Sequence, residues 1–149
     1  MSDLRELYQE VVLDHSRSPR NFRALADATG EADGTNPLCG DKVHVYVALE
    51  GDRVREVSFT GDGCAISKAS ASLMTQALRG KSRAEAEALF EGFHRLVMGE
   101  PALDDTERLG KLTVFAGVSE FPVRVKCASL AWHTFKAALD GTAAEVTTE

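Results

Sequence analysis

Apolar and polar residues alternate along "KVHVYVAL", residues 42–49, and again along "RVREVSFT", residues 53–60. A period of two is typical of a strand with one buried face. The intervening "EGD", residues 50–52, predicts a hairpin turn. The pattern therefore predicts two antiparallel strands, and the Gly- and Pro-containing stretch 21–38 before them leaves room for a short edge strand.

Other parts of the chain carry apolar residues at helical spacing, which predicts helices. The expected helices cover residues 2–18, 65–79, 82–98 and 122–139. Ser82 and Glu85 form a capping box, and Gly80 and Gly141 follow helix ends. Residues 104–122 predict a short helix and a loop. Helix, strands and then helices indicate an α+β fold, with helices packed on a small antiparallel sheet of three strands.

The length and net charge limit the classes of protein to which this chain can belong. A chain of 149 residues is expected to form one domain over 1–149, with residues 1–2 and 142–149 frayed. Its net charge of −6 argues against a nucleic-acid binder, because the chain has no excess of basic residues to neutralise phosphates. No apolar run is long enough for a membrane span, and the N-terminus lacks a signal-peptide pattern. A cytoplasmic protein is therefore expected.

The chain has three cysteines, Cys39, Cys64 and Cys127. In a reducing compartment an odd number makes a disulfide framework unfavourable. One interpretation is that all three are small buried hydrophobic residues. Their surroundings support a second interpretation, in which they share a site.

Two of the cysteines flank the predicted hairpin. Cys39 and Asp41 lie just before its first strand, and Cys64 follows its second strand. Because the start of one strand lies beside the end of its antiparallel partner, these three residues are expected to meet. Cys127 lies in the first turns of the last helix, where the helix dipole favours a thiolate, and Arg124 acts in the same direction.

Three thiols and a carboxylate form a plausible tetrahedral metal site, because zinc takes four such ligands. The chain has no Cys-x-x-Cys pair, so spacing alone leaves the metal site and the buried thiols as open alternatives. The histidines are expected elsewhere. His44, His94 and His133 are predicted at the surface or its boundary, and His15 at a helix end where a cation suits the dipole.

Four segments resemble the family of iron–sulfur assembly proteins called IscU and NifU, and most closely its SufU branch. They are "YQEVVLDHSRSPRNF", "NPLCGD", "FTGDGCAISKASASLMTQAL" and "FPVRVKCASLAW", in the family's order. The resemblance implies a SufE/NifU-like (IscU-like) fold. It also implies that Cys39, Asp41, Cys64 and Cys127 hold a metal ion, which in the SufU branch is zinc.

The same resemblance implies a function in iron–sulfur cluster biogenesis. A SufU-type protein is a zinc-dependent sulfurtransferase that accepts persulfide sulfur from a cysteine desulfurase of SufS type. The acceptor here would be Cys39, with Arg124 as a further candidate that stabilises its thiolate or pairs with a surface carboxylate. Sulfur would continue to cluster assembly or other sulfur-accepting proteins. Whether the chain is an enzyme in its own right or a sulfur-accepting component stays open.

Departures from the scaffold branch favour the sulfur-transfer branch. Lys126 stands where that branch has a histidine ligand before the third cysteine, and "EFPVRV" replaces its chaperone-docking segment. The stretch between Cys64 and Cys127 is also longer, with the extra part expected within 99–117. Two alternatives stay open: a scaffold that builds and transfers an iron–sulfur cluster, and a structural zinc domain that only docks to a partner.

Overall fold

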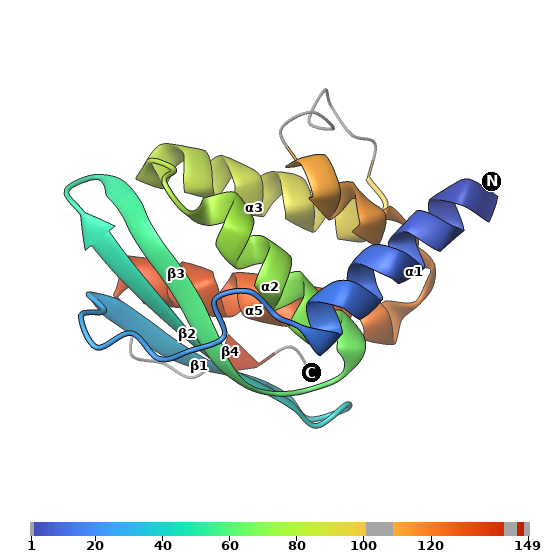
Figure 1. Cartoon of the computed structure of the whole chain (residues 1–149), viewed down its shortest axis with the longest axis horizontal. Helices are drawn as coiled ribbons and strands as arrows, with labels where there is room; N and C mark the ends of the chain where they lie inside the picture. The colour runs from blue at the N-terminus through green and yellow to red at the C-terminus, as the bar shows by residue number, and fades with distance from the viewer. Residues whose placement is uncertain (1, 101–108, 142–145, 148–149) are drawn as a thin grey trace.

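A computed structural model of the protein describes residues 2–100, 109–141 and 146–147, with only the backbone of 2–8 and 147 (Figure 1). The sheet contains three antiparallel strands, which confirms the predicted fold class. They are β1 (Gly30–Asn36), β2 (Asp41–Glu50) and β3 (Arg53–Asp62). A two-residue strand, β4 (Val146–Thr147), lies parallel to β1, so the sheet order is β3-β2-β1-β4. The tail expected to be frayed thus contains two residues that pair with the sheet.

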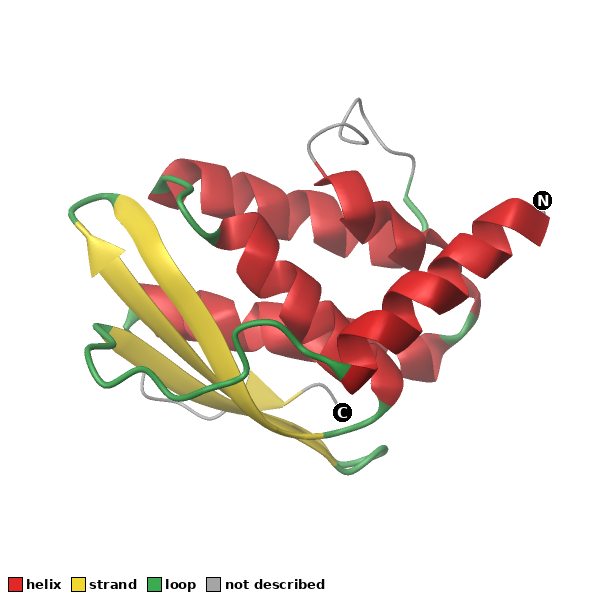
Figure 2. Ribbon diagram, in the orientation of Figure 1, coloured by secondary structure: helices red, strands yellow, loops and turns green. Residues whose placement is uncertain are grey.

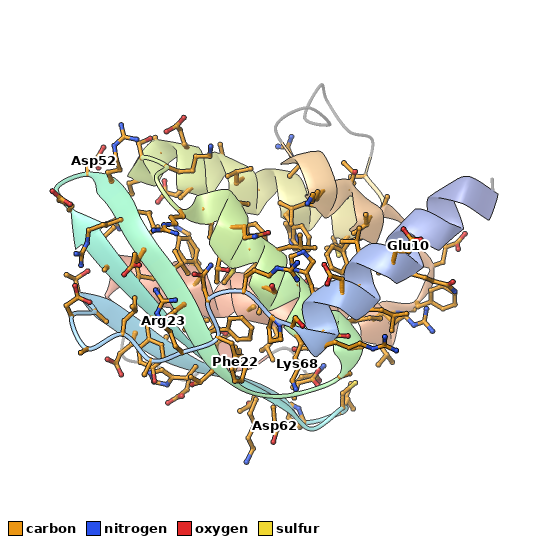
Figure 3. All side chains as sticks on the ribbon, viewed as in Figure 1. Glu10, Phe22, Arg23, Asp52, Asp62 and Lys68 are labelled. Carbon is orange, nitrogen blue, oxygen red and sulfur yellow. The ribbon has the colours of Figure 1, made fainter. Side chains whose placement is uncertain are left out.

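The register of the strands brings three chain segments to one end of the sheet. Asn36 at the end of β1 pairs with Asp41 at the start of β2, and Lys42 pairs with Asp62 at the end of β3. Figure 3 labels Asp62 at this end of the sheet. The turn after β1, which contains Cys39, therefore lies near the residues that follow β3.

The helices cover one face of the sheet (Figure 2). They are α1 (Ser2–Arg17), α2 (Ala65–Leu78), α3 (Arg83–Val97) and α5 (Pro122–Asp140), together with the 3-10 helix η1 (Gly110–Glu120). Helix α5 packs on β1 and β2, while α2 packs on β3. The alternation in β2 explains this arrangement, because Val43, Val45 and Val47 are buried toward the helices. Helices α3 and η1 pack outside, and Phe93 of α3 stacks on Trp132 of α5.

The predicted helix boundaries are close to those observed. Ser82 caps α3 and forms the expected capping box with Glu85, and Gly80 and Gly141 adopt positive φ angles of 82° and 74° after their helices. The segment predicted as a short helix and a loop contains η1, whose buried residues Leu112, Phe115 and Val118 anchor it. Residues 101–108, where part of the extra length was expected, lie outside the described residues.

His15 differs from its prediction. It is buried at 3% exposure, and its Nδ1 lies 2.7 Å from Oγ of Ser72 on α2. Burial, with the nearby charge of Arg20, lowers the pKa of His15, so the ring is neutral and not a cation at a helix end. The reason is tertiary, because α1 packs this face on α2. The segment after α1 is tied to the same helix, since Asn21 Nδ2 donates to Oγ1 of Thr75.

None of the helices within the described residues has both the length and the apolar character required to cross a membrane.

Candidate metal centre

Cys39 lies in the turn between β1 and β2, and its side chain is exposed. The turn is held by Asn36, whose backbone carbonyl accepts hydrogen bonds from the N–H groups of Cys39 and Gly40, at 3.2 and 2.9 Å. Gly40 has a φ of 72°, a conformation that glycine adopts without strain. The turn therefore places Cys39 at an exposed position at the end of the sheet.

Asp41 opens β2 and is 1% exposed. Its Oδ1 accepts a hydrogen bond from the backbone N–H of Cys64 at 2.8 Å, and its Oδ2 lies 3.8 Å from the Cys64 sulfur. The carboxylate thus connects the start of β2 to the start of α2. A buried carboxylate needs such partners, because an unpaired buried charge is costly.

Cys64 is the N-cap of α2, and its sulfur accepts a hydrogen bond from the backbone N–H of Ser67 at 3.4 Å. Gly63 before it is required for close approach. A Cβ there would lie 2.8 Å from Oδ1 of Asp41, which is closer than real Cβ contacts allow.

Cys127 lies on α5 and is buried at 3% exposure. Its sulfur is 3.3 Å from the sulfur of Cys39, to which it donates, and Nδ2 of Asn36 donates to it at 3.6 Å. Burial raises the pKa of the Cys127 thiol far above its usual range, and hydrogen bonds with Cys39 and Asp41 act in the same direction. The raised pKa favours the neutral thiol at Cys127, whose S–H donates a hydrogen bond to the sulfur of Cys39.

These residues form a convergent group of donor atoms. One ligand atom each from Cys39, Asp41 and Cys127 lies within 4.8 Å of the other two. The Cys64 sulfur stands outside this group, near Asp41 and turned toward the first turn of α2. The hairpin argument predicted that Cys39, Asp41 and Cys64 meet; Asp41 and Cys64 are in contact, whereas Cys39 converges with Asp41 and Cys127. All three cysteines are free thiols.

The two basic residues near Cys127 have different surroundings. Arg124 is exposed, and its guanidinium lies over the ring of Phe121, 4.6 Å from the ring centroid. Lys126 is half-buried and lines a groove beside α5. The role of Arg124 in the site stays a prediction.

Sequence reasoning missed Asn36 as a site residue. It is fully buried, it donates to Cys127, and its Oδ1 accepts from the N–H of Leu38 at 3.3 Å. An asparagine side chain that accepts a hydrogen bond from the backbone N–H two residues later favours a turn. The Asn in "NPLCGD" was therefore a local signal for this turn. The contact with Cys127 had no local signal, because the two residues are joined only by the packing of α5 on β1.

His44 lies at the boundary of the surface, as predicted, and it has two carboxylate partners. It is half-buried between two carboxylates, with Nδ1 2.5 Å from Asp33 and Nε2 2.9 Å from Glu31. Burial opposes the charged form of His44, but the hydrogen bonds that its ring N–H groups donate to Asp33 and Glu31 outweigh burial and raise the pKa of His44. The cluster lies on the sheet face opposite the helices, because His44 alternates with the buried valines of β2.

Comparison with known proteins shows the family of the chain. The family model of the NifU-like N-terminal domain matches residues 7–128. The chain belongs to this family. It is therefore a member of a family of iron–sulfur cluster assembly proteins, and the four segments that predicted the resemblance lie mainly within the matched range.

Two curated relatives in the family carry different descriptions. The chain is 42% identical to the zinc-dependent sulfurtransferase SufU of Bacillus subtilis, over 91% of this chain and 90% of the relative. It is 41% identical to the iron–sulfur cluster assembly scaffold protein IscU of Streptococcus pyogenes, over 93% of this chain and 86% of that one. The identities are nearly equal, so they do not separate the two functions.

Solved structures share the fold. One, from Fervidobacterium islandicum and described as an iron–sulfur cluster assembly scaffold protein for the SUF system, has a TM-score of 0.83 at 34% identity. The match covers 90% of this chain and 97% of that one. A NifU-like N-terminal protein from Brucella abortus matches with a TM-score of 0.81 over 91% of this chain and 93% of its own, and at 21% identity it supports the fold alone.

Proposed function

We propose that the chain accepts sulfur, as a persulfide on Cys39, from a cysteine desulfurase of SufS type and passes it on in iron–sulfur cluster biogenesis. The observation that carries this proposal is the difference between two adjoining sulfurs. Cys39 is exposed on a turn, while Cys127, 3.3 Å away, is buried on a helix. The sulfur of Cys39 can therefore contact a partner protein, whereas the sulfur of Cys127 stays buried.

The donor set fits a zinc ion. Thiolates and a carboxylate are the ligands that zinc takes in tetrahedral sites, and Cys39, Asp41 and Cys127 already converge. We assign Cys64 as the fourth ligand, which requires its sulfur to exchange the hydrogen bond from Ser67 for the metal. When bound, zinc would hold the thiols deprotonated, because thiol ligands bind metals as thiolates.

The surroundings of each ligand assign different roles. Asp41 and Cys127 are buried and held by hydrogen bonds from Cys64 and Asn36. Cys39 is held through the backbone of its turn, so its side chain can turn outward while the others stay in place. This arrangement suits a reactive thiolate beside a fixed site.

The transfer step is thiol–persulfide exchange. The Cys39 thiolate attacks the outer sulfur of the persulfide on the desulfurase cysteine. A new S–S bond forms on Cys39 as the S–S bond to the desulfurase cysteine breaks, and that cysteine leaves as a thiolate. Arg124, exposed three residues before Cys127, is proposed to stabilise the anionic sulfur at Cys39.

The test is to incubate the protein with the desulfurase and cysteine, and to map the persulfide by peptide mass. We expect the mass of one added sulfur atom on the Cys39 peptide and none on the Cys127 peptide, because Cys127 is buried. Cys39→Ser should abolish both the modification and the stimulation of the desulfurase. Normal sulfur acceptance by Cys39→Ser would overturn the proposal.

The cluster scaffold is the second candidate function, favoured by the relative in Streptococcus pyogenes that is described as a scaffold. Three cysteines and an aspartate can hold an iron–sulfur cluster. Anaerobic purification with both metals in the growth medium separates the two functions. Zinc with little iron supports sulfur transfer, whereas iron with acid-labile sulfide supports the scaffold.

A further inference from the structure

Asn36, the last residue of β1, is fully buried and holds the turn that follows it. Its backbone carbonyl accepts hydrogen bonds from the N–H groups of Cys39 and Gly40, at 3.2 and 2.9 Å. Its side-chain Oδ1 accepts from the N–H of Leu38 at 3.3 Å. One residue therefore binds three consecutive N–H groups of the turn that carries Cys39.

The same side chain also reaches the buried cysteine. Nδ2 of Asn36 donates a hydrogen bond to the sulfur of Cys127, with 3.6 Å between nitrogen and sulfur. The two residues are 91 positions apart, and the packing of α5 on β1 brings them together. Asn36 thus contacts two adjoining cysteines in different ways, because it binds the backbone of Cys39 but the sulfur of Cys127.

This difference affects which sulfur reacts. The sulfurs of Cys39 and Cys127 are 3.3 Å apart, so a persulfide on Cys39 that points inward would lie within reach of Cys127. The attacking form of a cysteine is the thiolate, and thiol ligands of a metal ion are thiolates. A hydrogen bond donated to a thiolate stabilises the electron pair that the attack must use, so that sulfur becomes a weaker nucleophile. The bond from Asn36 therefore opposes attack by Cys127.

We propose that Asn36 is a positioning residue that keeps the transferred sulfur on Cys39. The inference rests on the proposed function and adds to it the group that selects between two adjoining sulfurs. The step that Asn36 opposes is internal transfer, in which the Cys127 thiolate attacks the outer sulfur of the Cys39 persulfide. A new S–S bond forms on Cys127 as the S–S bond to Cys39 breaks, and Cys39 leaves as a thiolate. Sulfur on Cys127 would be lost to an acceptor protein, because this side chain is buried.

Substitutions separate the bond to Cys127 from the hold on the turn. Asn36→Ser is neutral and keeps a hydroxyl that can accept from the N–H of Leu38, but it is too short to donate to the Cys127 sulfur. Asn36→Asp, which keeps the acceptor and lacks the N–H donor, is the second variant if Asn36→Ser does not fold. Gly40→Ala is the matched control. It strains the turn at a φ of 72°, its Cβ would meet no atom within 4 Å, and Asn36 stays intact.

The first measurement maps the persulfide by peptide mass after the full-length proteins react with the desulfurase and cysteine. We expect Asn36→Ser to carry persulfide on the Cys127 peptide at no less than about ten times the wild-type background, because partners of metal ligands change activity by about 10- to 100-fold. Gly40→Ala should keep its persulfide on Cys39, even if the strained turn slows the reaction. A wild-type distribution in Asn36→Ser would overturn this inference alone, whereas a wild type without persulfide on Cys39 would overturn the proposed function and this inference with it.

The second measurement reports on the hydrogen bond and needs no desulfurase. Cobalt(II) is loaded in place of zinc, and the thiolate-to-cobalt charge-transfer absorption is recorded. Loss of the bond raises the energy of the Cys127 electron pair, so the absorption of Asn36→Ser should move to longer wavelength, while Gly40→Ala keeps the wild-type position. If Asn36 only shaped the turn, the absorption of Asn36→Ser would not move, and that result would overturn the inference.

Discussion

The backbone N–H of Cys64 donates a hydrogen bond to Oδ1 of Asp41, with 2.8 Å between nitrogen and oxygen. The bond joins residues 23 positions apart, the first residue of β2 and the N-cap of α2. Asp41 is therefore both a candidate metal ligand and a structural connection. Substitutions can separate these two roles.

Asp41→Ala should lower stability and metal retention together. A hydrogen bond to a charged group contributes about 1.5–3 kcal/mol, and the alanine leaves the Cys64 N–H without it. Asp41→Asn keeps an oxygen acceptor but removes the charge, so it should lose most of the zinc with a smaller loss of stability. Urea unfolding and zinc content of both variants, each compared with the wild type, measure the difference. Equal zinc retention in Asp41→Asn and the wild type would contradict the role of the charge.

Gly63→Ala should damage the centre through sterics alone. The added Cβ would lie 2.8 Å from Oδ1 of Asp41 and would displace the carboxylate. Gly117→Ala is the matched control, because its Cβ would meet no atom within 4 Å. We expect weaker zinc binding in a competition titration for Gly63→Ala and no change for Gly117→Ala. Wild-type affinity in Gly63→Ala would show that the carboxylate position is not required.

Because His15 is buried, we predict that the folded protein loses stability in acid. Its pKa is lowered in the folded protein, so its contribution is present above the unfolded value of about 6.5 and is lost as pH falls through the folded value. The stability difference between the wild type and His15→Gln should therefore shrink as pH falls from 7 toward 5. Urea midpoints across this range provide the measurement, and a difference independent of pH would contradict a neutral buried ring.

For His44 we predict that stability depends on pH in the opposite direction. Its pKa is raised by Asp33 and Glu31, so its contribution is present below about pH 6.5 and is lost as pH rises through the folded value. The advantage of the wild type over His44→Gln should shrink as pH rises from about 6.5. The carboxylates of Asp33 and Glu31 are exposed, so the effect should be small and should weaken further in high salt. A difference that grows with pH would exclude the carboxylate cluster as its cause.

For Arg124 we predict that substitution changes the rate of persulfide transfer and leaves the zinc content unchanged. If its charge stabilises the Cys39 thiolate, Arg124→Gln should slow persulfide transfer by at most about fivefold, because exposed charges interact weakly. Arg124→Lys should keep most of the rate, and Arg95→Gln, an exposed charge on α3, serves as the control. Single-turnover transfer at equal zinc content makes the comparison. The same rate in Arg124→Gln and the wild type would leave Arg124 as a surface residue stacked on Phe121.

Much of the centre could be predicted because its members sit beside strong local signals. Cys39 and Cys64 flank a hairpin whose alternation and turn are plain in the sequence, and antiparallel pairing then brings them to one end. The position of Cys127 could not be predicted from local signals, because it depends on where α5 packs. Family motifs supplied that relation, whereas periodicity alone did not.

The sequence by itself determined the elements, their order and the residues with chemical potential, because periodicity, turns and caps are local properties of the chain. Only the tertiary structure decided which sulfur is exposed and which is buried, how Asn36 reaches Cys127, and that His15 is a neutral buried ring. It also placed His94 beside His133. These relations join residues far apart in the chain, and side-chain burial and electrostatics depend on what other elements pack against each residue.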